Sequence, residues 1–65
     1  MKINSNLIRQ KREALGYSQE RLARLTDMSV KTISNLEWER GGPNVKTLAA
    51  VAKALNCSLD DLIIP

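Results

Sequence analysis

Near the middle of the chain, two segments with helical periodicity are separated by only a short turn, and this spacing constrains the fold more than any other feature. The first segment begins at Ser18, a residue type that caps helix N-termini. After the short turn at residues 27–28, Ser29 caps a second segment over residues 29–37. Two helices joined by so few residues, the second with a polar outward face, predict a helix-turn-helix unit at about residues 18–37.

Further helical segments flank this unit on both sides. The first begins with a cap among residues 4–6 and ends at Gly16, which favours the left-handed conformation of a helix stop. Another follows Asn44 and carries one apolar stripe. A short last segment begins at Ser58 and Asp61, which have the spacing of a capping box. Because no segment alternates with the period of a strand, the sequence predicts a compact all-α fold of five helices.

The size and charge of the chain limit what it can do. It has 65 residues, which suffices for one domain over residues 1–65, with marginal stability. Residues 1–40 hold eight Lys and Arg against five Asp and Glu, whereas residues 41–65 hold two of each, so the net charge of +3 lies in the first part. Such a basic half is expected of a nucleic-acid-binding domain, although an unspecialised basic surface explains this charge equally well.

The composition argues against several classes of protein. The chain has no His and a single cysteine, Cys57, so it offers no plausible zinc site and no pair of residues for nucleophilic catalysis. We therefore predict a protein that is not an enzyme and needs no cofactor or small-molecule ligand. No stretch approaches the ~20 apolar residues of a membrane span, and one cysteine forms no intrachain disulfide. These features favour a cytoplasmic protein without a membrane partner.

A specific pattern of residue types runs through the two central helices. It comprises Gln19, Leu22-Ala23, Asp27, Met28, Ser29, Ile33-Ser34, Leu36 and Glu37. This pattern resembles the helix-turn-helix of the phage repressor/Cro family, also called the xenobiotic-response-element family. The resemblance covers nearly the whole chain, including Pro43-Asn44 and the closing LNCSLDDLI. It implies a lambda-repressor-like domain in a transcription regulator of bacterial or phage origin that acts at the nucleoid.

Two residues depart from the family pattern. Asp27 stands where relatives usually have a glycine in the left-handed conformation, which Asp tolerates at some cost. We expect the turn to form nevertheless. Leu25 stands where relatives more often carry a polar residue, so we expect it to be partly exposed, and the sequence offers no reason for it.

The outward face of the segment 29–37 has the chemistry of a DNA-reading surface. The resemblance assigns base contacts to Val30, Lys31, Ser34 and Asn35. Lys31 can donate to the acceptors of guanine, Asn35 can pair with adenine, and Val30 can contact a thymine methyl group. A solvated helix surface without function is the alternative, and the family pattern favours the reading role in the major groove.

Other polar residues are expected to support this helix. By resemblance, the phosphate contacts are Gln19, Ser29, Thr32, Arg40, Asn44 and Lys46. The resemblance also pairs Arg12 with Glu37 across two helices, and a bidentate Arg–carboxylate pair would hold the reading helix in place. We expect Trp38 to pack over the following loop and the fourth helix, because large aromatic residues usually become buried.

The partners follow from the same resemblance. One reading helix contacts only a few base pairs, so we expect a homodimer on a palindromic DNA operator. Leu59, Ile63 and Ile64 are the candidate dimer contacts, because one turn of helix cannot bury all the apolar residues at this end of the chain. Transcriptional repression is the expected outcome. The alternatives are an antitoxin or protein-interaction module with secondary DNA binding, and one domain of a longer regulator.

Overall fold

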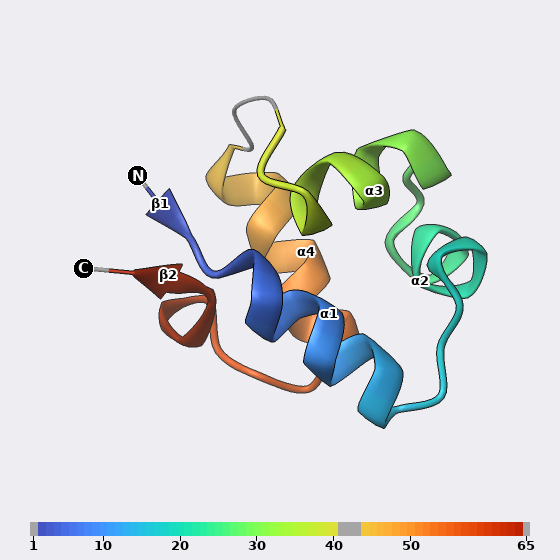
Figure 1. Ribbon diagram of the computed structural model, residues 1–65, viewed down its shortest axis with the longest axis horizontal. Helices are drawn as coiled ribbons and strands as arrows, with labels where there is room; N and C mark the ends of the chain where they lie inside the picture. The colour runs from blue at the N-terminus through green and yellow to red at the C-terminus, as the bar shows by residue number, and fades with distance from the viewer. Residues whose placement is uncertain (1, 41–43, 65) are drawn as a thin grey trace.

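The computed structural model describes residues 2–40 and 44–64 (Figure 1). Its elements in chain order are β1 Lys2–Ile3, α1 Ser5–Ala14, α2 Gln19–Thr26, α3 Val30–Glu37, α4 Val45–Ala54, the 3-10 helix η1 Asp60–Leu62 and β2 Ile63–Ile64. The predicted helical fold with a helix-turn-helix is thus confirmed for α1 to α4. The predictions of a fifth α-helix and of a fold without strands are not confirmed.

The four α-helices begin where the sequence predicts. Each is preceded by an Asn or Ser whose side-chain oxygen accepts a hydrogen bond from the backbone N–H three residues later. These caps are Asn4 (3.2 Å), Ser18 (3.0 Å), Ser29 (3.1 Å) and Asn44 (2.7 Å). Each satisfies one of the backbone donors that the first turn of a helix leaves unpaired. The prediction of a cap among residues 4–6 therefore resolves to Asn4.

All four α-helices also end in one motif, in which a residue in the left-handed conformation follows the last helical turn. The residues with positive φ are Gly16 (74°), Asp27 (57°), Glu39 (57°) and Asn56 (59°). In each case the next N–H donates to a carbonyl five residues back, at distances of 2.8 to 3.0 Å. This is the Schellman arrangement. The expectation that the turn survives with Asp27 is confirmed.

One apolar core unites the helices. Its buried members are Ile3, Ile8, Leu22, Ala23, Ile33, Leu36, Leu48, Val51, Ala52, Leu55 and Leu62. Helix α3 packs against both α1 and α2, and α2 also packs against α4. Ala23 is small enough to let α2 and α3 lie close together. The described part of the chain contains no helix long and apolar enough to cross a membrane.

The C-terminal segment differs from the prediction in two ways. The capping box forms, with Ser58 and Asp61 exchanging backbone-to-side-chain hydrogen bonds of 3.2 Å, but only the single 3-10 turn η1 follows it. The chain then becomes extended, and β2 pairs antiparallel with β1, Ile3 opposite Ile63 (Figure 1). Strands of two residues are too short to show alternation, and their pairing depends on backbone groups that the sequence pattern does not mark.

Candidate nucleic-acid interface

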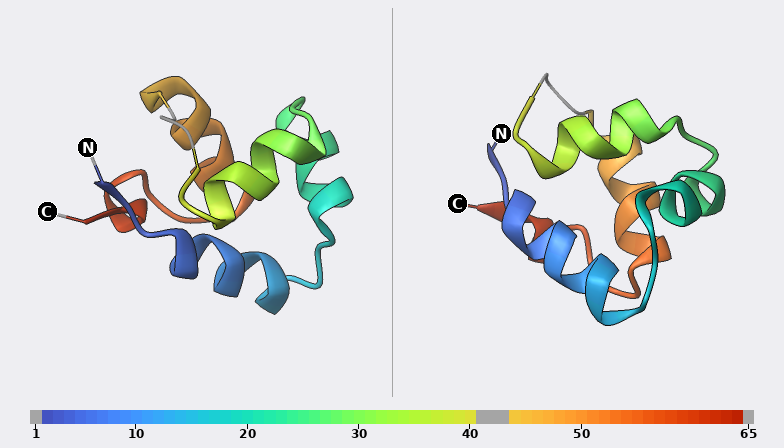
Figure 2. Two further views of the ribbon diagram at one scale, coloured as in Figure 1. Left: turned by 45° about the horizontal axis from the view of Figure 1, so that its top comes forward. Right: turned by 45° about the vertical axis from the view of Figure 1, so that its right-hand side comes forward.

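The predicted reading face lies on the outside of the molecule. Helix α3 lies along the upper edge of the molecule in Figure 1 and in the right-hand view of Figure 2. Ile33 and Leu36 point into the core, whereas Val30 is 40% exposed and Lys31 is also exposed. Ser34 and Asn35, the other two predicted base contacts, are half-buried.

The predicted phosphate contacts lie at helix starts and at the end of α3. Arg40 and Lys46 are exposed, and Lys46 lies in the first turn of α4. Ser29 caps α3 and lies 3.0 Å from the hydroxyl of Thr32. The carbonyl oxygen of the Asn44 side chain caps α4, so its NH₂ group points to no partner within the described residues and can donate to a phosphate.

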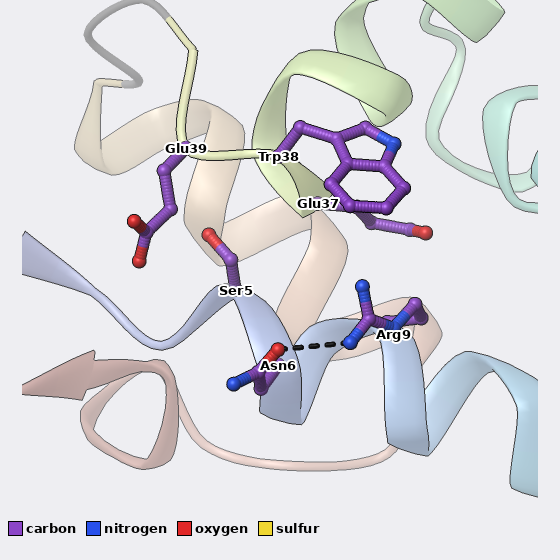
Figure 3. A pocket seen from close by; sticks show the side chains of 6 residues that line it. All are labelled: Ser5, Asn6, Arg9, Glu37, Trp38 and Glu39. Carbon is purple, nitrogen blue, oxygen red and sulfur yellow. Dashed lines mark hydrogen bonds between the residues drawn. The ribbon is translucent and has the colours of Figure 1, made fainter.

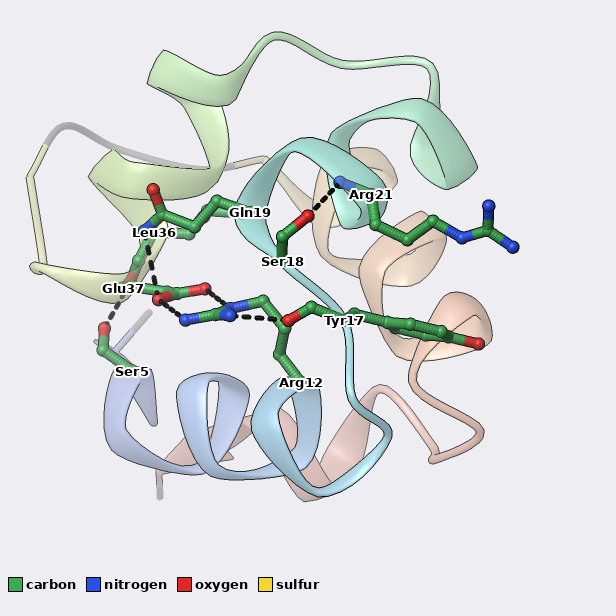
Figure 4. A network of polar contacts seen from close by, with 8 residues as sticks. All are labelled: Ser5, Arg12, Tyr17, Ser18, Gln19, Arg21, Leu36 and Glu37. Carbon is green, nitrogen blue, oxygen red and sulfur yellow. Dashed lines mark hydrogen bonds and ion pairs between the residues drawn. The ribbon is translucent and has the colours of Figure 1, made fainter.

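A bidentate ion pair lies beneath the C-terminal end of α3. The Nε of Arg12 donates to Glu37 at 2.6 Å and its Nη2 donates at 3.0 Å, while Nη1 donates to the carbonyl of Tyr17 at 2.7 Å (Figure 4). The side chains are 12% and 1% exposed. The hydrogen bond with Glu37 raises the pKa of Arg12. This geometry satisfies the guanidinium on three sides and connects α1 to α3.

Gln19 extends the pair to α2. Its side-chain Nε2 donates to Glu37 at 3.3 Å, from the first position of that helix (Figure 4). An amide NH₂ carries two hydrogens. One is therefore directed to Glu37, and the other has no acceptor within the described residues.

Ser5 provides a further contact that the sequence did not indicate beyond a possible cap. Its hydroxyl donates to the carbonyl of Leu36 at 2.6 Å, and the residue is 4% exposed (Figure 4). The last carbonyls of a helix have no partner within the helix. A serine in the first turn of α1 therefore completes the hydrogen bonding at the end of α3. Spacing alone does not reveal this contact, because 31 residues separate the two groups. We call Ser5, Arg12, Gln19 and Glu37 the polar anchor of α3.

The position predicted for Trp38 is wrong. Its side chain is 58% exposed and lies beside α1, with the Arg9 guanidinium 5.4 Å from the ring centroid. The two residues border an open hollow of about 250 Å³ that no residue of α4 lines (Figure 3). The attraction between a guanidinium and an indole face accounts for this arrangement without burial. The loop that Trp38 was also expected to cover, residues 41–43, lies outside the described residues.

The comparisons with known proteins agree with this geometry. A sequence model of the helix-turn-helix family matches residues 8–62. The chain belongs to the Cro/C1-type helix-turn-helix family. This is a family of DNA-binding regulators and not of enzymes. No curated protein matches the sequence.

Solved structures of helix-turn-helix regulators resemble this family member closely. A chain of the SinR protein/SinI protein complex has a TM-score of 0.84 and 27% identity, over 91% of this chain and 58% of that one. The clp gene regulator ClgR from Corynebacterium glutamicum has a TM-score of 0.81 and 30% identity, over 88% and 61%. SinR, the master regulator for biofilm formation, in complex with DNA has a TM-score of 0.79 and 26% identity, over 86% and 90%. The chain thus spans less than two thirds of the first two.

The remaining predicted residues of this helix-turn-helix protein lie near its C-terminal strand. Leu59 and Ile63 are half-buried, whereas Ile64 is 37% exposed.

Cys57 is half-buried against the core, and burial raises the pKa of its thiol. Across residues 2–40 and 44–64, no group of three His, Cys, Asp or Glu side chains is arranged to hold a metal ion.

Proposed function

We propose that the protein binds double-stranded DNA at a specific sequence, with α3 in the major groove, and regulates transcription. The observation that carries this proposal is the division of α3 into two faces. One face is fixed by the core and the polar anchor, and the other presents Val30, Lys31, Ser34 and Asn35 outward. A rigid helix with an outward polar face is what base recognition requires.

The four outward residues cover three kinds of base contact. Lys31 donates to the O6 and N7 of guanine, Asn35 donates to and accepts from adenine, and Val30 contacts a thymine methyl group. The hydroxyl of Ser34 can donate or accept a hydrogen bond, so it can contact either an acceptor or a donor on a base edge. The similarity to SinR, whose structure was solved in complex with DNA, supports this assignment.

The residues at the edges of α3 are proposed to hold the phosphates. Gln19 and Asn44, at the starts of α2 and α4, each keep amide hydrogens that no residue within 2–40 and 44–64 accepts. The hydroxyls of Ser29 and Thr32 at the start of α3, and the cations Arg40 and Lys46, complete this set. Because phosphate contacts release counterions, log affinity should fall steeply with log salt concentration.

A homodimer on a palindromic operator is part of the proposal. Ile64 is a partly exposed apolar residue on β2, with Ile63 and Leu59 beside it. Two copies meeting there would present two α3 helices for half-sites about 34 Å apart. Light scattering should give the dimer mass at micromolar concentration, and Ile64→Asp should give the monomer mass. Normal dimerisation of that variant would rule out this interface.

Repression in the cytoplasm, at the nucleoid, is the proposed outcome, because a small domain bound across a promoter blocks access to it. Selection of bound sites from a random double-stranded DNA pool gives the operator. A reporter gene behind that operator should then be expressed less when the protein is present. Higher expression would indicate activation and not repression.

The selected site also tests the assignment of residues. Asn35→Ala should weaken binding to it by about 1–3 kcal/mol and relax the preference at one base position. Lys46→Ala, the control, should weaken binding to all sequences alike. Equal loss on all sequences for Asn35→Ala, or affinity that does not change with salt, would contradict the proposal.

A further inference from the structure

Leu25 is an exposed apolar residue that has no role in the proposed DNA contacts. It is 47% exposed on α2 and lies outside the core. It lines an open groove of about 370 Å³ between α2 and α4. The other lining residues are Tyr17, Thr26, Ala50, Lys53 and Ala54.

The shape of the groove suits an apolar side chain from another molecule. Ala50 and Ala54 lie one turn apart on α4, and their small side chains leave room above the helix. Tyr17 and Leu25 are the large side chains that border this space. The hydroxyl of Thr26 already donates to carbonyls of its own helix, at 2.8 Å to Leu22, and so adds little polarity.

The charge at the groove is positive, because its one charged lining residue is Lys53. Arg21 lies one turn before Leu25 on α2, and its side chain extends on the same side of the molecule as the ring of Tyr17 (Figure 4). Within residues 2–40 and 44–64 the sole ion pair joins Arg12 and Glu37, so Arg21 and Lys53 have no carboxylate partner there.

The groove is separate from the proposed DNA contacts. Its lining comes from α2, α4 and the joint before α2, and it includes no residue of α3. A partner bound there leaves the outward face of α3 accessible. This inference therefore does not depend on whether the protein binds DNA.

We propose that this groove binds an acidic amphipathic helix of another protein. An apolar side chain of that helix enters between Leu25 and Ala54, and its carboxylates approach Arg21 and Lys53. Docking of an apolar helix face into a groove between two helices is a common mode of peptide recognition. Charge complementarity selects an acidic partner.

The test is selection of peptides from a displayed library of helical sequences with randomised surface positions. The wild-type protein is the bait, and Leu25→Gln is kept out of the selection so that binding to it is measured independently afterwards. Enriched peptides should combine a large apolar residue with Asp or Glu. Their affinity should fall at least tenfold for Leu25→Gln and for Lys53→Glu, and it should persist when the selected DNA is added.

Matched controls change the same residue types away from the groove. Leu15, which is 39% exposed, and Lys2 are not among its lining residues. Leu15→Gln and Lys2→Glu should therefore leave peptide affinity unchanged. All four positions are exposed, so thermal melts should show that every variant folds.

Three outcomes would overturn the proposal. One is that no peptide is enriched, or that enriched peptides are basic or bind Leu25→Gln equally well. Another is a dimer that Leu25→Gln abolishes, which would assign the groove to a second copy of the chain. The third is a loss of DNA affinity in Lys53→Glu as large as in Lys46→Ala, which would assign the groove to nucleic acid.

Discussion

The C-terminal ends of α1 and α3 adopt the same backbone motif but are held in different ways. At the end of α1, Gly16 adopts a φ of 74°, and the two residues before it are exposed, whereas Tyr17 after it is half-buried. At the end of α3, Glu39 adopts a φ of 57°, which costs energy for a residue with a Cβ. Ser5 and Glu37 of the polar anchor connect this end of α3 to α1 and α2.

The difference shows which helix end depends on local sequence and which depends on tertiary contacts. The end of α1 is formed by residues close in sequence, Gly16 and the hydrogen bond from Arg12 to the carbonyl of Tyr17. The end of α3 forms despite an unfavourable residue, because side chains from α1 and α2 hold it. In the proposed function this fixes the reading helix relative to Gln19, so base and phosphate contacts keep a constant geometry.

Removing the carboxylate of Glu37 should have the largest effect. Glu37→Ala leaves Arg12 without its partner in a partly buried site, so the free energy of unfolding should fall by about 3–5 kcal/mol. Urea denaturation followed by circular dichroism measures this. Glu20→Ala, at an exposed position of α2, is the control and should change stability little. An unchanged midpoint for Glu37→Ala would show that the pair contributes nothing.

Removing the hydroxyl of Ser5 should have the next largest effect. Ser5→Ala leaves the buried carbonyl of Leu36 without a partner, which costs about 1–3 kcal/mol. The same urea experiment measures the loss. Asn6→Ala, one residue later at an exposed position, should change the unfolding free energy by about 0.5 kcal/mol or less. Equal losses for the two variants would show that the Ser5 contact does not hold α3.

Gly16→Ala tests the end of α1. An added Cβ would meet no atom within 4 Å, so only backbone strain matters. The left-handed conformation costs about 1–2 kcal/mol for a residue with a Cβ, and the stiffer unfolded chain returns about 0.4–1 kcal/mol of that. We expect a net loss of about 1 kcal/mol, measured as a lower urea midpoint. Ala14→Gly would not test this position, because Ala14 lies within the helix. An unchanged midpoint for Gly16→Ala would mean that α1 ends differently.

The sequence predicted the helix starts and the family well, since Asn and Ser caps and the pattern from Gln19 to Glu37 depend on residue type at fixed spacing. It predicted the left-handed Gly16 and Asp27 for the same reason. It did not predict the left-handed Glu39, because nothing in that residue type marks such a position. The short strands escaped prediction too, since backbone pairing at the two ends carries no side-chain pattern.

Two further differences between the prediction and the structure concern the candidate site and have another cause. Ser5 was recognisable only as a possible cap, because its contact with α3 depends on how α1 crosses that helix. Trp38 was expected to be buried on the average behaviour of aromatic residues, and its neighbour Arg9 instead holds it at the surface. Apart from the pair of Arg12 and Glu37, which the family resemblance indicated, contacts between helices far apart in the sequence need the fold before they can be inferred.

Glu39→Gly should have the smallest effect and the opposite sign. Glycine removes the strain of the left-handed conformation, about 1–2 kcal/mol, and makes the unfolded chain more flexible, which costs about 0.4–1 kcal/mol. The net expectation is a gain of about 0.5–1 kcal/mol, seen as a higher urea midpoint.

Two controls separate the causes of that gain. Glu39→Ala removes the carboxylate from the C-terminal end of α3, where the helix dipole disfavours a negative charge, but it keeps the Cβ and should therefore gain less. Asn56→Gly changes a residue in the same conformation, with a φ of 59°, whose short polar side chain tolerates it, so little strain is relieved and the more flexible unfolded chain should lower its midpoint slightly. A loss of stability in Glu39→Gly would mean that the glutamate side chain itself supports the end of α3. The contrast with Gly16 would then lie in side-chain contacts alone and not in backbone strain.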